Sequence, residues 1–294
     1  MVSLVQCLMG IDDEYIRRSS AMSRPSTTAR ESSTIRTVHS DAGYLSTHRD
    51  RERIMASLSE SRTAEPSNVH RLVIVEGIMG SGKSTTMRFI AKHLQDAGQP
   101  AIPIHERTDP HPVRATDELE HWFEPWRDAT PEDLADRALA RWAAFVEYTQ
   151  TDAEIPVLDG QLFHGDLTHL LLMEADTALI FAYIRKLVTV IAPLNPFVLY
   201  LWQEDVEEAV RAVCAERGAE WIDYQVNWKL AAPYCVRKGF VGLDGLISLY
   251  RDYRRLTDDL FQELPLAKLA IENSGRDWPA YERRILHKLG LPTR

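Results

Sequence analysis

Short apolar runs alternate with longer stretches in which apolar residues recur at helical spacing, from residue 69 onward. The short runs are typical of buried parallel strands, and the longer stretches are typical of helices that cover them. Strands are predicted at residues 72–75, 101–104, 155–158, 197–201 and 267–271. Helices are predicted at residues 85–97, 131–149, 166–191 and 243–264, and after caps at Asp205 and Asp277, while 219–242 shows no regular pattern. This alternation predicts an α/β fold with a five-stranded parallel sheet between two layers of helices.

Residues 1–68 have a different composition, rich in Ser, Thr and Arg and poor in large apolar side chains. Such a segment buries too little surface to offset the entropy of ordering it, so we expect a disordered N-terminal extension. A regulatory tail, a transit peptide and an extension before a true start near Met55 are the alternatives, and the acidic residues argue against a transit peptide. Residues 69–294 are expected to form one domain.

Net charge and cysteine usage exclude several classes of function. The net charge of −9 does not favour a nucleic-acid-binding surface. Cys7, Cys214 and Cys235 are widely spaced and form no CxxC pair, so neither a zinc site nor a disulfide framework is indicated. This usage favours a cytoplasmic protein. The most apolar region, 167–194, is interrupted by four charged residues and is interpreted as a buried helix, so no membrane partner is expected.

A phosphate-binding motif follows the first predicted strand. Gly77-x-x-x-x-Gly82-Lys83-Ser84 matches the P-loop pattern and precedes a predicted helix. Glycines let the backbone N–H groups point at an anion, the helix start adds its dipole, Lys83 adds a cation and the Ser84 hydroxyl can ligate Mg²⁺. The predicted nucleotide-binding residues are Gly77, Met79, Gly80, Ser81, Gly82, Lys83, Ser84 and Thr85.

Signatures of other P-loop classes are missing from this sequence. It has neither the Asn/Thr-Lys-x-Asp motif with which GTPases recognise guanine nor the Leu-Ser-Gly-Gly-Gln motif of transporter ATPases. Motor ATPases place a Glu after the second acidic motif, whereas Asp159, at the end of the third strand, is followed by Gly160. These absences together favour a small kinase.

Three segments resemble the thymidylate kinase and deoxynucleoside kinase group. The first is Glu76-Gly-x-x-Gly-Ser-Gly-Lys-Ser-Thr85, and looser likenesses cover residues 193–218 and 269–278. The resemblance implies a P-loop three-layer sandwich with a helical lid, ATP and Mg²⁺ as cofactors, and a small molecule as the phosphoryl acceptor. The thymidylate kinase stretch Arg-Glu-Pro-Gly-Gly is not reproduced, which weakens thymidylate as the acceptor.

The resemblance also suggests residues for the chemistry. Asp159 would act on the magnesium shell or the acceptor, the alternative being a turn residue before Gly160, which stands where the family has Arg. Gln161, His164 and Asp166 follow closely and are candidates for substitute contacts, with a surface or capping role as the equal alternative for His164. Glu106, just after the second strand, is the candidate general base, with Asp109 as its local competitor and a solvated loop acid as the alternative.

Cations near the predicted lid complete the candidate set. Arg211 and Arg217 would stabilise the transferring phosphoryl group, or simply complement a helix C-terminus. The segment 219–242 is aromatic and basic, and either covers the substrate or packs as an ordinary amphipathic region; its members are Trp221, Tyr224, Trp228, Lys229, Tyr234, Arg237, Lys238 and Phe240. Trp122, Phe123 and Trp126, in the insertion 111–130, are expected to border the acceptor pocket.

The predicted function is ATP- and Mg²⁺-dependent phosphoryl transfer to a small hydroxylated or phosphorylated acceptor. One alternative is an antibiotic or metabolite phosphotransferase on the same fold. Another is an ATP-binding regulator or ATPase that uses residues 1–68 as an interaction segment. The acceptor is left open by the sequence, and a homodimer is retained as an option for assembly.

Overall fold

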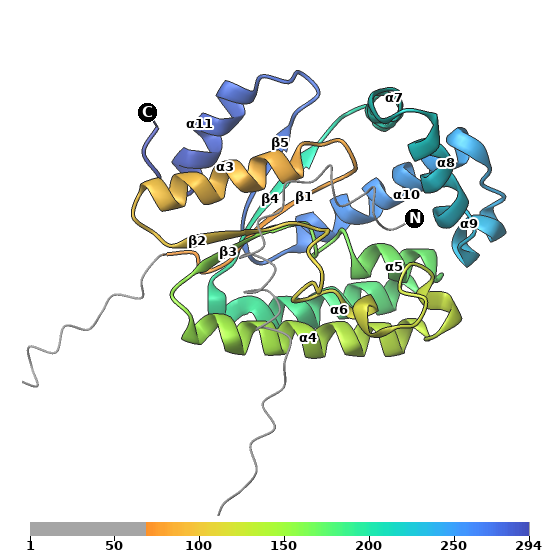
Figure 1. Ribbon diagram of the computed structural model, residues 1–294, viewed down its shortest axis with the longest axis horizontal. Coiled ribbons are helices and arrows are strands. Elements are labelled where there is room, and N and C mark those ends of the chain that lie inside the picture. The colour runs from red at the N-terminus through yellow and green to blue at the C-terminus, as the bar shows by residue number, and fades with distance from the viewer. Residues whose placement is uncertain (1–68, 294) are drawn as a thin grey trace, which may run out of the picture. The chain divides into compact units, whose positions relative to one another are not determined.

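The computed structural model describes residues 69–293, and in this part of the chain five strands form one parallel sheet. The strands are β1 (Val73–Gly77), β2 (Ala101–Ile104), β3 (Ile155–Asp159), β4 (Phe197–Trp202) and β5 (Ala267–Glu272). Their order is β2-β3-β1-β4-β5, with β1 in the centre (Figure 1). The predicted α/β fold with a five-stranded parallel sheet is therefore confirmed. The proposed extension, residues 1–68, lies outside the described residues.

Helices cover both faces of the sheet (Figure 1). They are α3 (Lys83–Asp96), α4 (Pro131–Thr151), α5 (Asp166–Leu172), α6 (Thr177–Ile191), α7 (Val206–Arg217), α8 (Ala219–Lys229), α9 (Pro233–Lys238), α10 (Gly242–Glu263) and α11 (Trp278–Lys288), with 3₁₀ turns at Ala115–Glu118, Pro125–Arg127 and Ala192–Leu194. Successive strand side chains point to opposite faces. Val73 and Val75 pack with α3 and α11, while Ile74 packs with α4, α6 and α10, which gives three layers.

Two helix predictions need correction. The predicted helix 166–191 is two helices, α5 and α6, because Glu174 adopts a left-handed backbone conformation (φ 59°) and the Asp176 side chain accepts a hydrogen bond from the Ala178 N–H, capping a new helix. The segment 219–242 is also helical, as α8 and α9. In α8 only Lys229 is buried, so the segment lacks the apolar stripe by which a helix is recognised in a sequence.

The stretch Thr177–Leu194 is long and apolar enough, with a mean hydropathy of 1.6, to meet the criteria for a membrane-spanning helix. Core helices of globular domains meet the same criteria. A third of this stretch is buried within the domain, and Ile180, Ile184 and Leu187 belong to the larger core cluster. The segment therefore has a packing role in this fold.

The carboxyl ends of the parallel strands meet at one edge of the sheet, where ligands bind in open α/β folds. Val75 of β1 lies beside Asp159 at the end of β3, and Gly77 lies beside Leu201 of β4. The register thus brings the phosphate-loop motif and the predicted acidic residue Asp159 to neighbouring positions.

Candidate active site

The loop between β1 and α3 has a backbone that requires glycine. Gly77 and Gly82 both have positive φ angles, 147° and 89°. A side chain at Gly77 would collide with the Leu201 carbonyl, and one at Gly82 would collide with the Trp278 ring. The motif is therefore a tightly packed loop whose shape excludes other residues at these two positions.

Distant residues hold this loop in place. Asn273, just after β5, donates from its side-chain amide to the Ser81 carbonyl at 2.7 Å. The Asn273 side-chain oxygen in turn accepts from Gln203, and its backbone N–H donates to the Trp202 carbonyl at 2.8 Å. Val213 of α7 lies against Gly80. The loop is thus fastened from both β4 and β5, which reduces the reorganisation needed to bind an anion.

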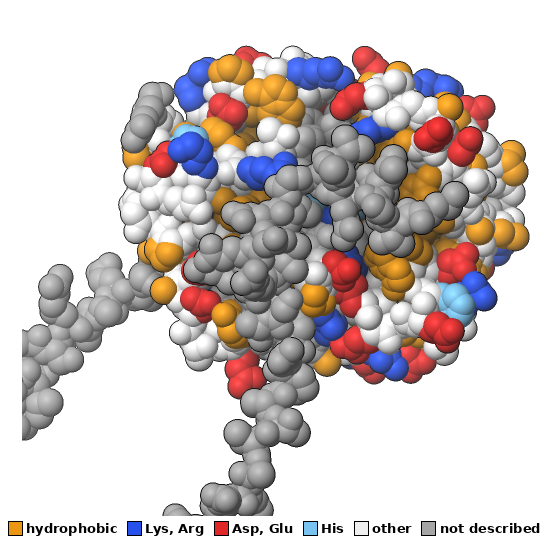
Figure 2. Space-filling view, viewed as in Figure 1, with side chains coloured by type: hydrophobic (Ala, Val, Ile, Leu, Met, Phe, Trp, Pro, Cys, Tyr) orange, Lys and Arg blue, Asp and Glu red, His pale blue; other side chains and the backbone are white. Residues whose placement is uncertain are grey.

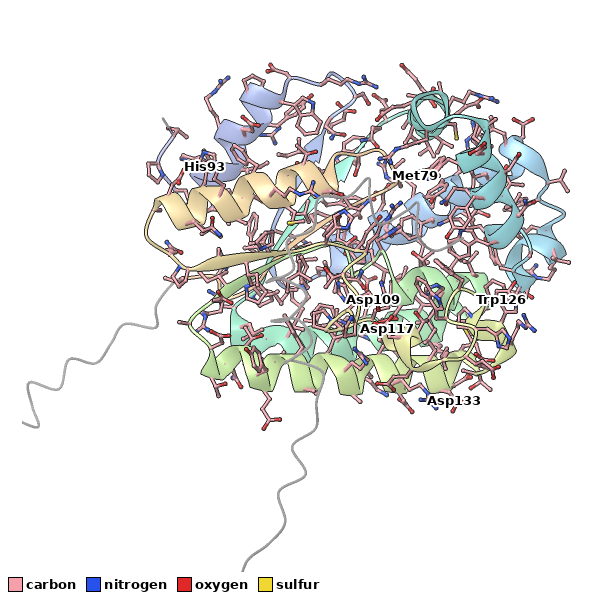
Figure 3. All side chains as sticks on the ribbon, viewed as in Figure 1. Met79, His93, Asp109, Asp117, Trp126 and Asp133 are labelled. Atoms are coloured by element: carbon pink, nitrogen blue, oxygen red, sulfur yellow. The ribbon has the colours of Figure 1, made fainter. Side chains whose placement is uncertain are left out.

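The remaining predicted loop residues differ in exposure. The Met79 side chain lies in the larger core cluster, so its contribution to an anion site would be its backbone N–H (Figure 3). Ser81 is buried, whereas Thr85 is exposed on the first turn of α3. Lys83 is buried at the start of α3 and donates from Nζ to the Ile78 carbonyl at 3.1 Å, so its ammonium lies across the loop.

Ser84 and Asp159 meet at the end of the loop. The Ser84 hydroxyl donates to Asp159 Oδ2 at 2.6 Å. Asp159 is fully buried, and its Oδ1 has no hydrogen-bond partner among the described residues. Residues 69–293 hold no cluster of three or more His, Cys, Asp and Glu that could bind a metal ion. A hydroxyl and one carboxylate fit Mg²⁺ instead, because Mg²⁺ takes most of its remaining ligands from water and phosphate oxygens.

Glu76, the residue before the loop, organises the segment after β3. Its fully buried carboxylate accepts backbone N–H groups from Leu162 at 2.7 Å, Phe163 at 2.9 Å and His164 at 3.2 Å. Burial raises the pKa of Glu76 to about 7, although these hydrogen bonds and Lys83 act in the opposite direction. Sequence reasoning used Glu76 only as part of the resemblance, and nothing local indicated its partners, which lie 86 to 88 residues away.

Gly160 opens the turn that Glu76 holds. Its φ is 76° and that of Gln161 is 89°, both in the left-handed region. A side chain at Gly160 would press against His164, at 3.0 Å from its Cβ. This turn places His164 next to Glu106, with His164 Nε2 3.1 Å from the Glu106 carboxylate.

Glu106 lies beside the phosphate loop, held by two neighbours. Its carboxylate is 3.1 Å from His164 Nε2, and its backbone carbonyl accepts from Arg114 at 3.0 Å. Burial would raise the pKa of Glu106, but His164, Lys83 and His105 together hold it well below its usual value. His105 Nε2 is 3.5 Å from Asp159 Oδ2, which links the ends of β2 and β3.

Asp109, the competing acid, is differently placed. Its side chain is 87% exposed, and its nearest cation is Arg114 at 4.0 Å. Arg114 also binds the Asp117 carboxylate, and both aspartates lie on the connection from β2 to α4 (Figure 3). Arg114 thus organises this connection, while Glu106 rather than Asp109 is the acid that is partly buried near Lys83.

The two predicted lid arginines are on the surface of α7. Arg211 pairs with Glu207 and Asp244, each at 2.9 Å, and Arg217 is exposed at the end of the helix. Within residues 69–293, neither arginine hydrogen-bonds to the phosphate loop. Lys83, Ser84, Asp159 and Glu106 are therefore brought together in this structure without them.

Aromatic residues of α8 pack against the insertion between β2 and α4. Phe123 lies 5.4 Å from Trp228 and 6.2 Å from Tyr224, measured between ring centroids, and it contacts Trp122. Hydrophobic side chains gather on this face between the α8–α9 region and the insertion (Figure 2). The basic residues of α9 pair with carboxylates, Arg237 with Glu174 and Lys238 with Asp252. The contacts of Phe123 with Tyr224 and Trp228 therefore join the predicted lid to the insertion that is expected to border the acceptor pocket.

No protein-family model matches this chain, and a comparison with curated proteins found no relative.

Proposed function

We propose that the protein is an ATP- and Mg²⁺-dependent phosphotransferase acting on a small hydroxylated or phosphorylated acceptor. The observation that carries the proposal is the packed phosphate loop in which the Ser84 hydroxyl meets the buried Asp159 carboxylate at 2.6 Å. Phosphate loops with this hydroxyl–carboxylate arrangement serve nucleoside triphosphates with magnesium.

The donor side would be built by the loop and α3. Backbone N–H groups of residues 78–84 and the start of α3 would hold the phosphates, with the Lys83 ammonium against them. Ser84 and Asp159 would hold Mg²⁺, Asp159 through its free Oδ1 or through water. When bound, Mg²⁺ supplies neutralisation of the phosphate charge.

The acceptor side would be built around Glu106. Its lowered pKa keeps the carboxylate ionised at neutral pH, so it can accept the proton of an acceptor hydroxyl. His164 fixes the orientation of this carboxylate, and Arg114 fixes the backbone that carries it. In phosphoryl transfer such positioning matters more than the strength of the base.

We extend the proposal to a divergent relationship with the thymidylate kinase and deoxynucleoside kinase group. It is supported by the central position of β1 and by Glu106 at the end of β2. The turn at Gly160 departs from that group, so the identity of the acceptor is not carried over. A hydroxylated metabolite or antibiotic therefore stands beside nucleosides and nucleotides as an acceptor class to test.

The test is ADP release from Mg·ATP by the full chain, with and without a panel of nucleosides, nucleotides and hydroxylated metabolites. Acceptor-dependent release is expected, and Lys83→Ala should lower it by about two orders of magnitude or more. Lys92→Ala is the matched control, because Lys92 is an exposed lysine of the same helix that pairs with Asp96.

Unchanged ADP release in Lys83→Ala, with thermal unfolding like that of the wild type, would refute the assignment. Release that ignores every acceptor but changes when residues 1–68 are deleted would instead indicate a regulator with slow ATPase activity.

A further inference from the structure

Lys229, the last residue of α8, is a buried cation without an acidic partner. It is 4% exposed. Its Nζ lies 4.5 Å from the centroid of the Trp228 ring and 5.4 Å from that of Tyr250. Within residues 69–293 it makes no ion pair and no hydrogen bond through Nζ, unlike Arg237 and Lys238 in the next helix. An uncompensated buried charge is costly for the fold, which suggests that a ligand supplies the missing partner.

The surroundings of Lys229 belong to the acceptor side of the site. The charges of Glu106 and Lys83 both act on it, and burial lowers the pKa of Lys229 to about 8. His169 of α5 lies in the same region, with its ring 6.4 Å from that of Trp228 and its Nδ1 without a partner among the described residues. Two polar groups from different helices thus have unused hydrogen-bonding capacity beside the candidate base.

Other charges near Lys229 are already compensated. Arg114 binds the Asp117 carboxylate, and Glu106 is held by His164. Burial and the charge of Lys229 lower the pKa of His169 to about 3, so this ring is neutral and can donate a hydrogen bond without adding charge. Lys83 faces the phosphate loop through the Ile78 carbonyl, which leaves Lys229 as a cation that an anion on the acceptor side would complement.

Aromatic rings lie next to Lys229. Trp228 packs against Phe123 of the insertion between β2 and α4, and the buried Tyr250 ring of α10 lies near the Lys229 ammonium. Charge interactions are stronger in a region of low dielectric constant than in water. A single lysine here can therefore contribute substantially to the binding of an anion.

We propose that Lys229 binds an anionic group, a phosphate or a carboxylate, that the acceptor molecule carries besides the group to be phosphorylated. The proposal rests on the proposed function, because it takes Glu106 as the marker of the acceptor side. Lys83 and the loop N–H groups already serve the donor phosphates, which leaves Lys229 for the second substrate. It would supply the anion recognition for which the turn at Gly160 has no arginine.

Calorimetric titration of the full chain tests this assignment. The donor site is first filled with magnesium and the non-hydrolysable β,γ-imido analogue of ATP, so that no probe enters the γ-phosphate position. The probes are matched pairs: nucleosides and their 5′-monophosphates, sugars and sugar phosphates, and diols and hydroxy acids. Phosphorylated and carboxylated probes together distinguish the two kinds of anion.

At least one anionic probe is expected to bind more tightly than its neutral counterpart. Lys229→Met should lower the affinity for that probe about ten- to hundredfold, which is the effect of losing one charge-assisted hydrogen bond. The affinity for the neutral probe should not change. Lys229→Arg should recover part of the affinity. Lys238→Met, which removes a neighbouring exposed lysine paired with Asp252, should have no effect.

Equal affinity of Lys229→Met and wild type for every anionic probe would overturn the proposal, as would a wild type that prefers none of them. A variant that binds the anionic probes normally but turns over slowly would also overturn it, since Lys229 would then act on the transferred group. Failure of the wild type to bind the ATP analogue would overturn the proposed function itself. Thermal unfolding of both Lys229 variants confirms that each is folded.

Discussion

The donor and acceptor halves of the candidate site are built by different means. The donor half is a short continuous loop made mainly of backbone, and it is fixed by Asn273, just after the edge strand β5, and by Trp278 of α11. The acceptor half is made of side chains from separate elements, including Glu106 and Lys229. Backbone geometry can be encoded in a local motif, whereas a cluster of side chains depends on the whole fold.

Two buried carboxyl groups show the same contrast. Burial raises the pKa of both Glu76 and Asp166 to about 7. Glu76 accepts three backbone N–H groups, whereas Asp166 accepts one, from Ala115 at 3.2 Å, and its Oδ2 has no partner among the described residues. The Glu76 carboxyl group, next to the donor loop, is therefore held by more hydrogen bonds than the Asp166 carboxyl group.

The largest expected effect is on catalysis in the acceptor half. Glu106→Gln should lower the turnover number by about two to four orders of magnitude, because the amide cannot accept the proton of the acceptor hydroxyl. Asp109→Asn, a change of the same kind in the exposed competitor, should leave turnover within about twofold of the wild type. Steady-state kinetics with the stimulating acceptor would measure both. A larger loss for Asp109→Asn than for Glu106→Gln would reverse the assignment of the base.

The next effect is on stability in the donor half. Glu76→Ala leaves two buried N–H groups and one partly buried N–H group without acceptors, and should lower the free energy of unfolding by about 3 kcal/mol or more. Glu76→Gln keeps one oxygen for Leu162 and Phe163 but turns an NH₂ group toward His164, so a smaller loss is expected. Urea denaturation would rank the two variants. Equal stability of Glu76→Ala and wild type would show that the turn does not depend on this carboxyl group.

The smallest effect, about 1 kcal/mol for each pH unit, is a dependence of stability on pH. The pKa of Asp166 is about 7 in the fold against an ordinary 3.8, so between these values the folded state holds the proton more tightly than the unfolded state. The contribution of Asp166 to stability is therefore greatest at low pH and is lost as pH rises to about 7. Asp166→Asn, which keeps an oxygen for the Ala115 N–H, should remove this loss.

Denaturation of Asp166→Asn and wild type at several pH values would measure this. The free energy of unfolding of the variant, relative to that of the wild type, should rise by about 1 kcal/mol per pH unit between pH 4 and 7. Above pH 7 this difference should stay constant. A difference independent of pH would mean that Asp166 titrates at the same pH in both states.

The sequence predicts the donor half well and the acceptor half only in part. The apolar runs locate all five strands, and the rule that strand ends meet at one edge leads from the loop to Asp159. The hydrogen bonds from the backbone of residues 162–164 to Glu76 could not be predicted, because the two segments are 86 to 88 residues apart in the sequence. Lys229 lies in a segment that shows no regular pattern in the sequence. From the sequence alone, it cannot be distinguished from a surface lysine, because its burial depends on the helices that pack around it.

The fastening of the phosphate loop has a consequence for protein synthesis. The Ser81 carbonyl and Asn273 are 192 residues apart, and Trp278, which covers Gly82, comes later still. On the ribosome, the loop sequence emerges long before the residues that fix its shape. A nascent chain that stops short of β5 therefore carries the motif without the contacts that hold the loop in its folded shape.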